Sequence, residues 1–190
     1  LFACIQVVTL NRKMCFVRLT EINKTMIRMC LDAGATGLIF STVETAAQAK
    51  EIQKICNYPL HGGIRGLGLV RENSWGRKNL VNEKPVLIAQ IETVKGVDNI
   101  KMISAHDFDY YMVGPYDLSA SLGHPGNFNH NSFLNALTVI GKTIPENKLG
   151  VHIPNNVKNE LKKYKKYGMI ALGMDTTFIL EKYEEIEGYA

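Results

Sequence analysis

Two acidic residues follow apolar runs, at positions where neighbouring strands of a parallel sheet would end. Glu92 comes directly after the run Val86–Ile91, and Asp117 lies shortly after an apolar run that ends at Val113. In a parallel sheet these ends meet at one edge, so the two carboxylates would lie side by side and repel each other. A divalent cation such as Mg²⁺ would remove that conflict, because it binds one or two protein carboxylates and completes its shell with water and substrate oxygens.

A structural explanation of these residues also stays open. Asp117 could cap the following helix, and Glu92 could pair with a lysine. Arg18 lies on a short apolar run that should form a buried strand. Its guanidinium could stabilise negative charge that develops on a substrate oxygen near a metal, or it could form an ion pair with an acid at the rim of the sheet.

Short apolar runs alternate with helical stretches between Cys15 and Asp175, a pattern typical of a parallel sheet covered by helices. The predicted strands are Cys15–Leu19, Gly37–Phe40, Pro85–Ile91, Phe108–Val113, Leu149–Ile153 and Met169–Gly173. The predicted helices are Leu1–Leu10, Ile22–Ala33, Val43–Cys56, Gly96–Ser104, Ser132–Thr143 and Asn155–Tyr167.

Six parallel strands fit either an open doubly wound sheet or part of an eight-stranded TIM (β/α)8 barrel. No GxGxxG segment follows the first strand and no Walker motif occurs, so a nucleotide-binding doubly wound fold lacks its main support. A barrel builds its site at the carboxyl ends of its strands. Polar side chains lie at those ends here: Arg18, Glu92, Asp117 and His152. We therefore predict an α/β fold in which residues 1–190 form a single, partial TIM-barrel domain.

The composition excludes several classes of protein. Hydrophobic residues make up 46% of the 190 residues and charged residues 21%, which excludes a disordered chain. The net charge is only +4. The densest basic segment, Lys158–Lys166, is interpreted as the solvated face of a helix, so we predict no nucleic-acid partner. No apolar stretch reaches the roughly 18 residues that span a bilayer, so we predict no membrane partner.

The four cysteines have no CxxC spacing and lie among apolar neighbours: Cys4, Cys15, Cys30 and Cys56. This arrangement predicts buried, reduced thiols in a cytoplasmic protein rather than a zinc site.

Two motifs resemble the signature pair of the HpcH/HpaI aldolase family. They are QIETVKGV at residues 90–97 and VGPYDLSASLG at residues 113–123. Weaker matches follow the family's order along nearly the whole chain, at residues 16–19, 32–35, 58–59, 63–66 and 173–177. Members of this family are TIM barrels that cleave or form 2-keto-4-hydroxy acids, using pyruvate, a small aldehyde and a divalent metal.

The resemblance assigns roles to individual residues. Glu92 and Asp117 would bind the divalent cation, Mg²⁺, Mn²⁺ or Co²⁺. Arg18 would be catalytic and contact the keto oxygen that becomes the enolate. Such charge stabilisation lowers a barrier because it favours the transition state over the ground state.

The substrate-binding residues follow from the same resemblance. Gln90 and Gly114 would line the pyruvate site, and the backbone N–H groups of Tyr116 and Asp117 would hold the carboxylate of pyruvate. His152 stands where an apolar side chain is common in the family. It could tune the aldehyde pocket, or it could be a plain hydrogen-bonded histidine at the rim.

The sequence also departs from the family pattern. The family's barrel has two strands ahead of the strand that carries Arg18, so the chain would supply the third to eighth strands. The earlier segment normally carries an acid/base histidine, and no histidine of this sequence stands in the matching context. The stretch from Trp75 to Pro85 looks shorter than in the family. We therefore expect the chain as given to be incomplete and not fully active alone.

Three interpretations of function follow. The first is a metal-dependent pyruvate aldolase, which the glycine-rich segment Gly63–Gly68 and Trp75 predict to be a homo-oligomer, a hexamer as in the family. The second is a lyase similar to the citrate lyase β subunit that acts on a CoA thioester. The third is a catalytically inactive homologue that serves as an assembly subunit.

Overall fold

The computed structural model describes residues 1–78, 84–154 and 157–188. Within these residues, a single parallel sheet contains six strands that are neighbours in chain order. They are β1 (Phe16–Leu19), β2 (Gly37–Phe40), β3 (Val86–Ile91), β4 (Tyr110–Val113), β5 (Leu149–Ile153) and β6 (Met169–Leu172). Each predicted strand is confirmed, with ends that lie within two residues of the predicted ones.

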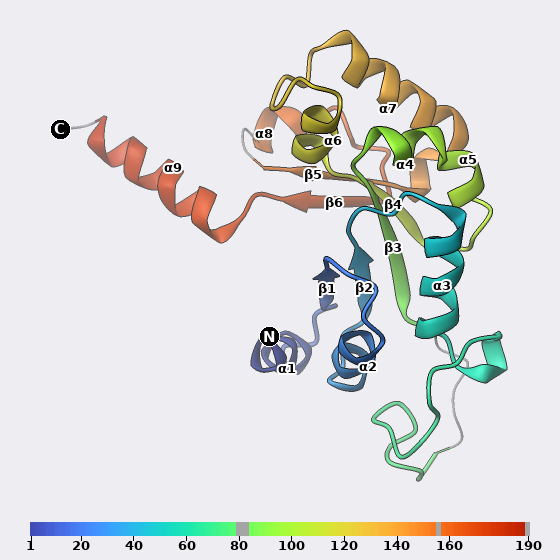
Figure 1. Cartoon of the computed structure of the whole chain (residues 1–190). Helices are drawn as coiled ribbons and strands as arrows, with labels where there is room; N and C mark the ends of the chain where they lie inside the picture. The colour runs from blue at the N-terminus through green and yellow to red at the C-terminus, as the bar shows by residue number, and fades with distance from the viewer. Residues whose placement is uncertain (79–83, 155–156, 189–190) are drawn as a thin grey trace.

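The helices follow the strands along the chain. They are α1 (Phe2–Leu10), α2 (Lys24–Asp32), α3 (Ala46–Cys56), α4 (Val94–Asp98), α5 (Ile100–Ile103), α6 (Pro115–Ser121), α7 (Asn131–Thr143), α8 (Val157–Glu160) and α9 (Asp175–Glu187). Two 3₁₀ turns, η1 (Pro59–His61) and η2 (Glu146–Lys148), complete the set. The sheet curls into a half-barrel, and α3, α5 and α7 lie along its outer face (Figure 1). This arrangement confirms the predicted partial TIM barrel.

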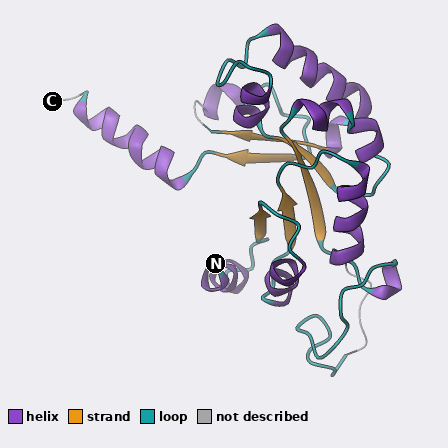
Figure 2. Cartoon of the chain, in the orientation of Figure 1, coloured by secondary structure: helices purple, strands orange, loops and turns teal. Residues whose placement is uncertain are grey.

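The two faces of the sheet have different side chains because successive strand residues point in opposite directions. The face toward the helices carries apolar residues such as Val17, Leu38 and Leu87, which belong to the main hydrophobic core. Strand register places Arg18 beside Ile39 and Gln90 beside Met112 on the opposite, inner face. Figure 2 shows the helical layer against the outer face of the strands. The inner face is therefore the one that can present polar groups to a substrate.

Local hydrogen bonds explain where several helices begin. Thr45 and Gln48 form a capping box at the start of α3, so this helix begins after the predicted Val43. Thr93 accepts a hydrogen bond from the backbone N–H of Gly96 and caps α4. The predicted helix Gly96–Ser104 is therefore wrong in outline, because the segment forms two short helices, α4 and α5, that meet at Asn99.

One further helical prediction needs correction, and two helices had no sequence prediction. The predicted helix Asn155–Tyr167 is helical only at Val157–Glu160, residues 161–166 form turns, and residues 155 and 156 lie outside the described residues. The helices α6 and α9 were not predicted. Helix α9 has no buried residue and extends away from the sheet (Figure 1). Several of its apolar side chains are exposed: Phe178, Ile179, Leu180, Tyr183 and Ile186.

The cysteines and the helices bear on two sequence predictions. Cys15, Cys30 and Cys56 are buried free thiols, as predicted, but Cys4 on α1 is exposed, so the prediction that it is buried was wrong. None of the helices in the described part of the chain is long and apolar enough to cross a membrane.

Candidate active site

A cavity of about 420 Å³ opens at the carboxyl ends of the first strands. We call it the rim cavity, and its lining consists of Arg18, Thr20, Ser41, Thr42, Glu92, Thr93 and Asp117. These residues come from the ends of β1, β2 and β3 and from the start of α6, which follows β4. The structure thus brings together Arg18, Glu92 and Asp117, the three charged residues that the sequence singled out, at the place where a barrel builds its site.

Glu92 is almost fully buried, with 4% of its surface exposed. Its Oε1 accepts two hydrogen bonds of 2.8 Å from Thr42, one from the backbone N–H and one from the hydroxyl. Its Oε2 is buried and has no hydrogen-bond partner among the described residues. A buried carboxylate oxygen without a partner is costly, and a bound cation would satisfy it. The donor set therefore fits a divalent metal.

The electrostatics of Glu92 point the same way. Burial raises the pKa of the Glu92 carboxyl, and the negative charge of Asp117 raises it further. The hydrogen bonds from Thr42 and the positive charge of Arg18 act in the opposite direction but do not outweigh burial. A strand-end carboxylate of this kind, desolvated and next to a second acid in a cavity, is typical of functional sites.

The structural explanations of the two acids do not hold. Asp117 is exposed and lies in the first turn of α6, whereas the N-cap of that helix is Gly114. Lys95, the lysine close in sequence to Glu92, pairs instead with Glu44 at 3.0 Å. Among the described residues, neither the helix cap expected of Asp117 nor the lysine pair expected of Glu92 is seen.

Gly114 and Gln90 shape the space next to the unpartnered oxygen. A Cβ at Gly114 would lie 2.5 Å from Oε2 of Glu92 and 2.7 Å from Nε2 of Gln90, closer than real Cβ atoms come. Gln90 is 6% exposed, and its Oε1 lacks a hydrogen-bond partner within the described residues. The absence of a side chain at Gly114 thus keeps open a small space that two polar groups face.

Arg18 supplies a positive charge at the same cavity. Its side chain is exposed, and Nη1 donates a long hydrogen bond of 3.4 Å to Oγ of Ser41. None of the ion pairs found within residues 1–78, 84–154 and 157–188 includes Arg18, so the predicted rim ion pair is not seen. The guanidinium is therefore available to an anionic ligand.

The two loops that carry the acids are tied together. Glu44 accepts a hydrogen bond of 2.9 Å from the Thr93 hydroxyl, and its backbone carbonyl accepts one of 2.8 Å from Asn99. The backbone N–H of Val43 donates to the carbonyl of Gln90 at 3.1 Å. These bonds make the loop after β2 and the loop after β3 one rigid support for Glu92. Sequence reasoning missed this support, because Glu44 and Thr42 look like ordinary loop residues.

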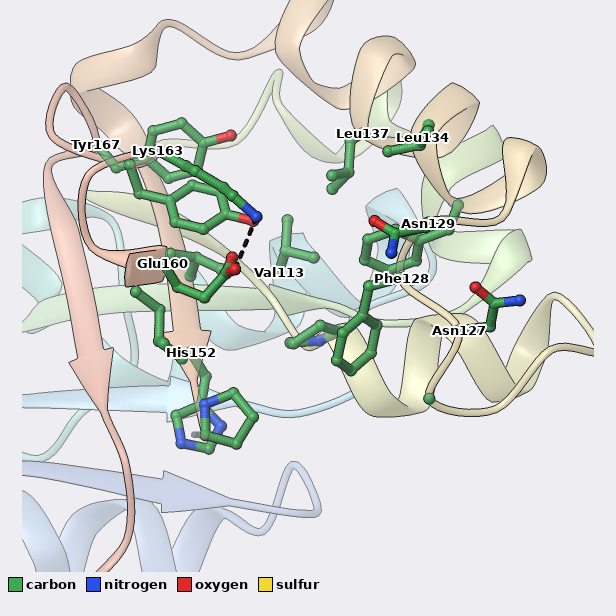
Figure 3. A pocket seen from close by; sticks show the side chains of 17 residues that line it. Val113, Asn127, Phe128, Asn129, Leu134, Leu137, His152, Glu160, Lys163 and Tyr167 are labelled. Carbon is green, nitrogen blue, oxygen red and sulfur yellow. Dashed lines mark hydrogen bonds and ion pairs between the residues drawn. The ribbon is translucent and has the colours of Figure 1, made fainter. Parts of the chain in front are cut away.

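His152 lies apart from the rim cavity. Its Nε2 is 3.1 Å from the carbonyl oxygen of Gly173, which is the contact expected of a hydrogen-bonded rim histidine. It lines a second cavity of about 370 Å³ between β4, β5, α7 and the segment around α8. Figure 3 shows Leu134 and Leu137 on one side of this cavity and the ion pair of Glu160 and Lys163, 2.7 Å long, on the other. A role of His152 toward an aldehyde stays a prediction.

The side chains available as metal ligands indicate which kind of cation the rim cavity could bind. The described part of the chain holds no group of three or more His, Cys, Asp or Glu side chains placed to bind one metal. Two carboxylates, with water and substrate filling the remaining positions, suit a hard ion such as Mg²⁺ or Mn²⁺ better than Zn²⁺. Among the described residues, no histidine lines the rim cavity.

Comparison with known proteins shows which family the chain belongs to. The chain is 31% identical over 173 residues to a 4-hydroxy-2-oxovalerate aldolase of Rhodococcus jostii (strain RHA1), a match that covers 87% of this chain and 67% of the relative. It is 29% identical over 181 residues to a hydroxypyruvate/pyruvate aldolase of Pseudomonas aeruginosa, covering 90% of this chain and 67% of that protein. The chain thus spans about two thirds of the length of both relatives.

A solved structure and a family model agree with these matches. The crystal structure of a HpcH/HpaI aldolase/citrate lyase family protein from Burkholderia cenocepacia J2315 superimposes with a TM-score of 0.79 and 26% sequence identity, over 92% of this chain and 72% of that one. The model of the family described as HpcH/HpaI aldolase/citrate lyase matches residues 1–181. The chain belongs to the HpcH/HpaI aldolase/citrate lyase family.

Proposed function

We propose that this protein is a divalent-metal-dependent aldolase, a carbon–carbon lyase that cleaves a 2-keto-4-hydroxy acid into pyruvate and a small aldehyde. The observation that carries the proposal is the buried Oε2 of Glu92, which has no hydrogen-bond partner among the described residues and lies with Asp117 and Arg18 in one rim cavity. The aldolase names of the relatives support this activity. They favour it over a lyase that acts on a CoA thioester and over an inactive homologue.

Glu92 and Asp117 would hold the cation, which we expect to be Mg²⁺, Mn²⁺ or Co²⁺. When bound, such an ion polarises the keto group of the substrate and stabilises negative charge on its oxygen. Glu92 would contribute Oε2, since Thr42 already occupies Oε1. Gly114 would leave the room that the ion and the substrate need beside Glu92.

Arg18 would act on the same oxygen of the substrate. As a base takes the proton of the C4 hydroxyl, that oxygen becomes the aldehyde carbonyl, the bond between C3 and C4 breaks, and its electron pair moves toward the keto oxygen, where negative charge grows. Protonation of the enolate at C3 then gives pyruvate. The guanidinium of Arg18 faces the rim cavity and carries a permanent positive charge, so it stabilises this oxygen more as the charge develops. That difference between transition state and ground state is what accelerates the step.

The pyruvate part of the substrate would bind beside these charges. The first N–H groups of a helix lack intrahelical partners and attract anions, so those of Tyr116 and Asp117 at the start of α6 would hold the carboxylate. Gln90 faces the space next to Gly114, and its side-chain amide would line the pyruvate. The aldehyde part would extend toward β5, where His152 would tune the pocket.

We also propose that the protein is a homo-oligomer, a hexamer or another multiple of a dimer. Large apolar side chains are exposed on the segment between η1 and β3, where Leu67, Leu69 and Trp75 expose 51%, 75% and 65% of their surfaces. A neighbouring copy would cover them. Light scattering on the purified protein checks this, and a monomer at micromolar concentration would contradict it.

We expect the protein to work in the cytoplasm. Cys15, Cys30 and Cys56 are free thiols inside the core of the described residues. Burial raises the pKa of the Cys56 thiol to about 12, so it stays protonated and unreactive. Free core thiols are common in reducing compartments.

The experiment that tests the function has two readouts. Calorimetric titration with Mn²⁺ should show one site in the wild-type protein and none in Asp117→Asn, because this change removes a charged ligand while keeping the shape of the side chain. Release of pyruvate from 4-hydroxy-2-oxovalerate should require the metal and fall with the same substitution. Unchanged Mn²⁺ binding in Asp117→Asn would sink the assignment of the site.

A further inference from the structure

The loop residue Thr42 makes an unusual contact with the candidate metal ligand Glu92. Its backbone N–H and its hydroxyl both donate to Oε1 of Glu92, each at 2.8 Å. Two donors on one oxygen use both of its lone pairs. The other oxygen, Oε2, faces the space beside Gly114 and has no hydrogen-bond partner within the described residues. The two oxygens of one carboxylate are thus in opposite situations.

Thr42 also has an unfavourable backbone conformation. Its φ is 54°, in the left-handed region that β-branched residues avoid. Residues held in such conformations cluster at functional sites, where the surrounding structure enforces them. Here the neighbouring bonds enforce it. The backbone N–H of Val43 donates to the carbonyl of Gln90, and the backbone N–H of Thr45, the N-cap of α3, donates to Oε1 of Gln48. The left-handed turn points the N–H and the hydroxyl of Thr42 at the same oxygen.

We propose that Thr42 is a positioning residue that presents a single oxygen of Glu92 to the cation and so favours small octahedral ions over Ca²⁺. The inference rests on the proposed function, in that Glu92 binds the metal. With Oε1 occupied by Thr42, Glu92 binds through Oε2 alone. Mg²⁺ and Mn²⁺ accept single-oxygen ligands in an octahedron, whereas Ca²⁺ takes 6–8 oxygens and commonly uses both oxygens of one carboxylate.

The bonds of Thr42 also fix the direction of Oε2. A carboxylate with one free torsion at its end can rotate, and rotation would exchange Oε1 and Oε2. Two short hydrogen bonds to Oε1 prevent this and keep Oε2 on the side of Gly114. Partners that orient a metal ligand change metal affinity by about 10–100-fold when they are removed. The hydroxyl of Thr42 is the part of this support that mutagenesis can remove.

The test compares three substitutions of Thr42 by calorimetric titration with Mn²⁺ and with Ca²⁺. Thr42→Val keeps the branched shape and the N–H but loses the hydroxyl, so Mn²⁺ should bind about tenfold more weakly while Ca²⁺ binding changes little. Thr42→Ser keeps the hydroxyl and should restore the wild-type preference for Mn²⁺. Thr42→Gly relieves the left-handed conformation, so its thermal midpoint should be unchanged or higher although Mn²⁺ binds more weakly.

A matched control removes a hydroxyl elsewhere. Thr138 is exposed on α7, and its hydroxyl donates at 2.9 Å to the carbonyl of Leu134. Thr138→Val should leave the Mn²⁺ affinity as in the wild type. A combination of weaker Mn²⁺ binding and undiminished stability in Thr42→Gly would not arise from a merely structural role.

The outcomes separate this inference from the proposed function. If Glu92→Gln abolishes Mn²⁺ binding but Thr42→Val binds Mn²⁺ and Ca²⁺ as the wild type does, the role of Thr42 is wrong and the metal site stands. If Glu92→Gln binds Mn²⁺ unchanged, both are wrong. A tenfold loss for Mn²⁺ in Thr42→Val, reversed in Thr42→Ser, supports the inference.

Discussion

Two clusters of charged side chains, each around one buried charge, lie at opposite ends of the parallel strands. At the rim, Glu92 is buried next to Asp117 and Arg18 at the carboxyl ends of the strands. At the base, Arg65 is 4% exposed and contacts Asp32 at 2.8 Å and Glu72 at 2.6 Å. Helix α2 ends at Asp32, a few residues before β2 begins at Gly37, which places this second cluster near the amino end of that strand.

The two clusters differ in whether partners offset the cost of burial. At the base, burial alone would lower the pKa of Arg65, but its hydrogen bonds to Asp32 and Glu72 outweigh burial and raise this pKa above its usual value. The guanidinium also lies 4.5 Å from the centre of the Tyr58 ring. At the rim, the effect of burial is larger than that of the hydrogen bonds from Thr42, so the pKa of Glu92 is raised. The charge of Arg65 is thus compensated within the fold, and that of Glu92 is not.

This difference separates a structural charge from a functional one. In the cluster around Arg65 the fold supplies two carboxylates for one guanidinium, so the positive charge is balanced, although Nε of Arg65 has no hydrogen-bond partner among the described residues. A carboxylate that the fold buries and leaves half satisfied, like Glu92, needs something from outside the chain. In TIM barrels the amino-terminal face serves stability and the carboxyl-terminal face carries chemistry. The charges of the two clusters agree with this division: the charge of Arg65 serves stability, and that of Glu92 is available for chemistry.

Glu92→Gln should have the largest effect on activity, with no loss of stability. It removes the buried charge and keeps the shape, so we expect pyruvate release to fall by about 10³-fold or more, as when a group that stabilises a developing oxyanion is lost. Stability of the metal-free protein should stay the same or rise, because an uncharged amide is less costly to bury. Steady-state kinetics and thermal unfolding check the two effects. A large loss of stability would show that Glu92 serves the fold, as Arg65 does.

Arg65→Ala should give the reverse result. Removing one partner of a buried ion pair costs about 3–5 kcal/mol. We expect about 3 kcal/mol here, at the lower end of that range, because the side chains of Asp32 and Glu72 remain 32% and 33% exposed and can hydrate. Mn²⁺ affinity of the folded fraction should not change. Urea unfolding measures the first effect and calorimetry the second. If Arg65→Ala instead bound Mn²⁺ more weakly and kept full stability, the assignment of Arg65 to stability and of Glu92 to metal binding would be wrong.

The sequence could predict the rim far better than the base. Glu92 directly follows one apolar run and Asp117 lies four residues after the end of the next, at Val113. Strand ends of a parallel sheet must meet at one edge, so their proximity followed from pattern alone. The partners of Arg65 come from the end of α2 and from the segment before β3, and nothing in the spacing of Asp32, Arg65 and Glu72 indicates that they meet. Thr42 was missed for a similar reason, since a left-handed φ at a threonine has no sequence signal.

The helices show where periodicity fails. The stretch after Gly96 has the composition of one helix, but Thr93 caps α4 and Asn99 ends it after a little more than one turn. The lysine-rich segment after Val157 has helical composition over a longer range than the helix itself, because few of its side chains are buried against the sheet to stabilise more turns.

Gly114→Ala should narrow the space beside Oε2 of Glu92. The new Cβ would lie 2.5 Å from Oε2 of Glu92, so either the carboxylate or the backbone must move. We expect Mn²⁺ affinity and kcat/KM to fall by about 10–100-fold, the range seen when the surroundings of a metal ligand are altered. Calorimetry and steady-state kinetics measure both effects.

The matched control for that change is Gly141→Ala on α7. A Cβ there meets nothing within 4 Å, and alanine is the better helix former. We therefore expect a gain in stability of about 0.5–1 kcal/mol with no change in metal affinity. If Gly114→Ala binds Mn²⁺ as tightly as Gly141→Ala does, the space beside Oε2 is not the metal site.

The smallest expected effect concerns how far the functional rim extends around the sheet. His152 lies on β5, two strands away from Glu92, and its Nε2 is bonded to the carbonyl of Gly173. If it lines the aldehyde part of the site, His152→Asn should change the ratio of kcat/KM for a short and a long aldehyde by about tenfold, the size of effect that one pocket contact gives. If it only ties β5 to the end of β6, the ratio should stay constant while stability falls by about 1 kcal/mol, the contribution of one hydrogen bond. Aldol addition of pyruvate to acetaldehyde and to a longer aliphatic aldehyde, together with urea unfolding, distinguishes the two. A constant ratio would limit the chemistry of this chain to the ends of β1–β4. His152 would then be a structural residue, as Arg65 is.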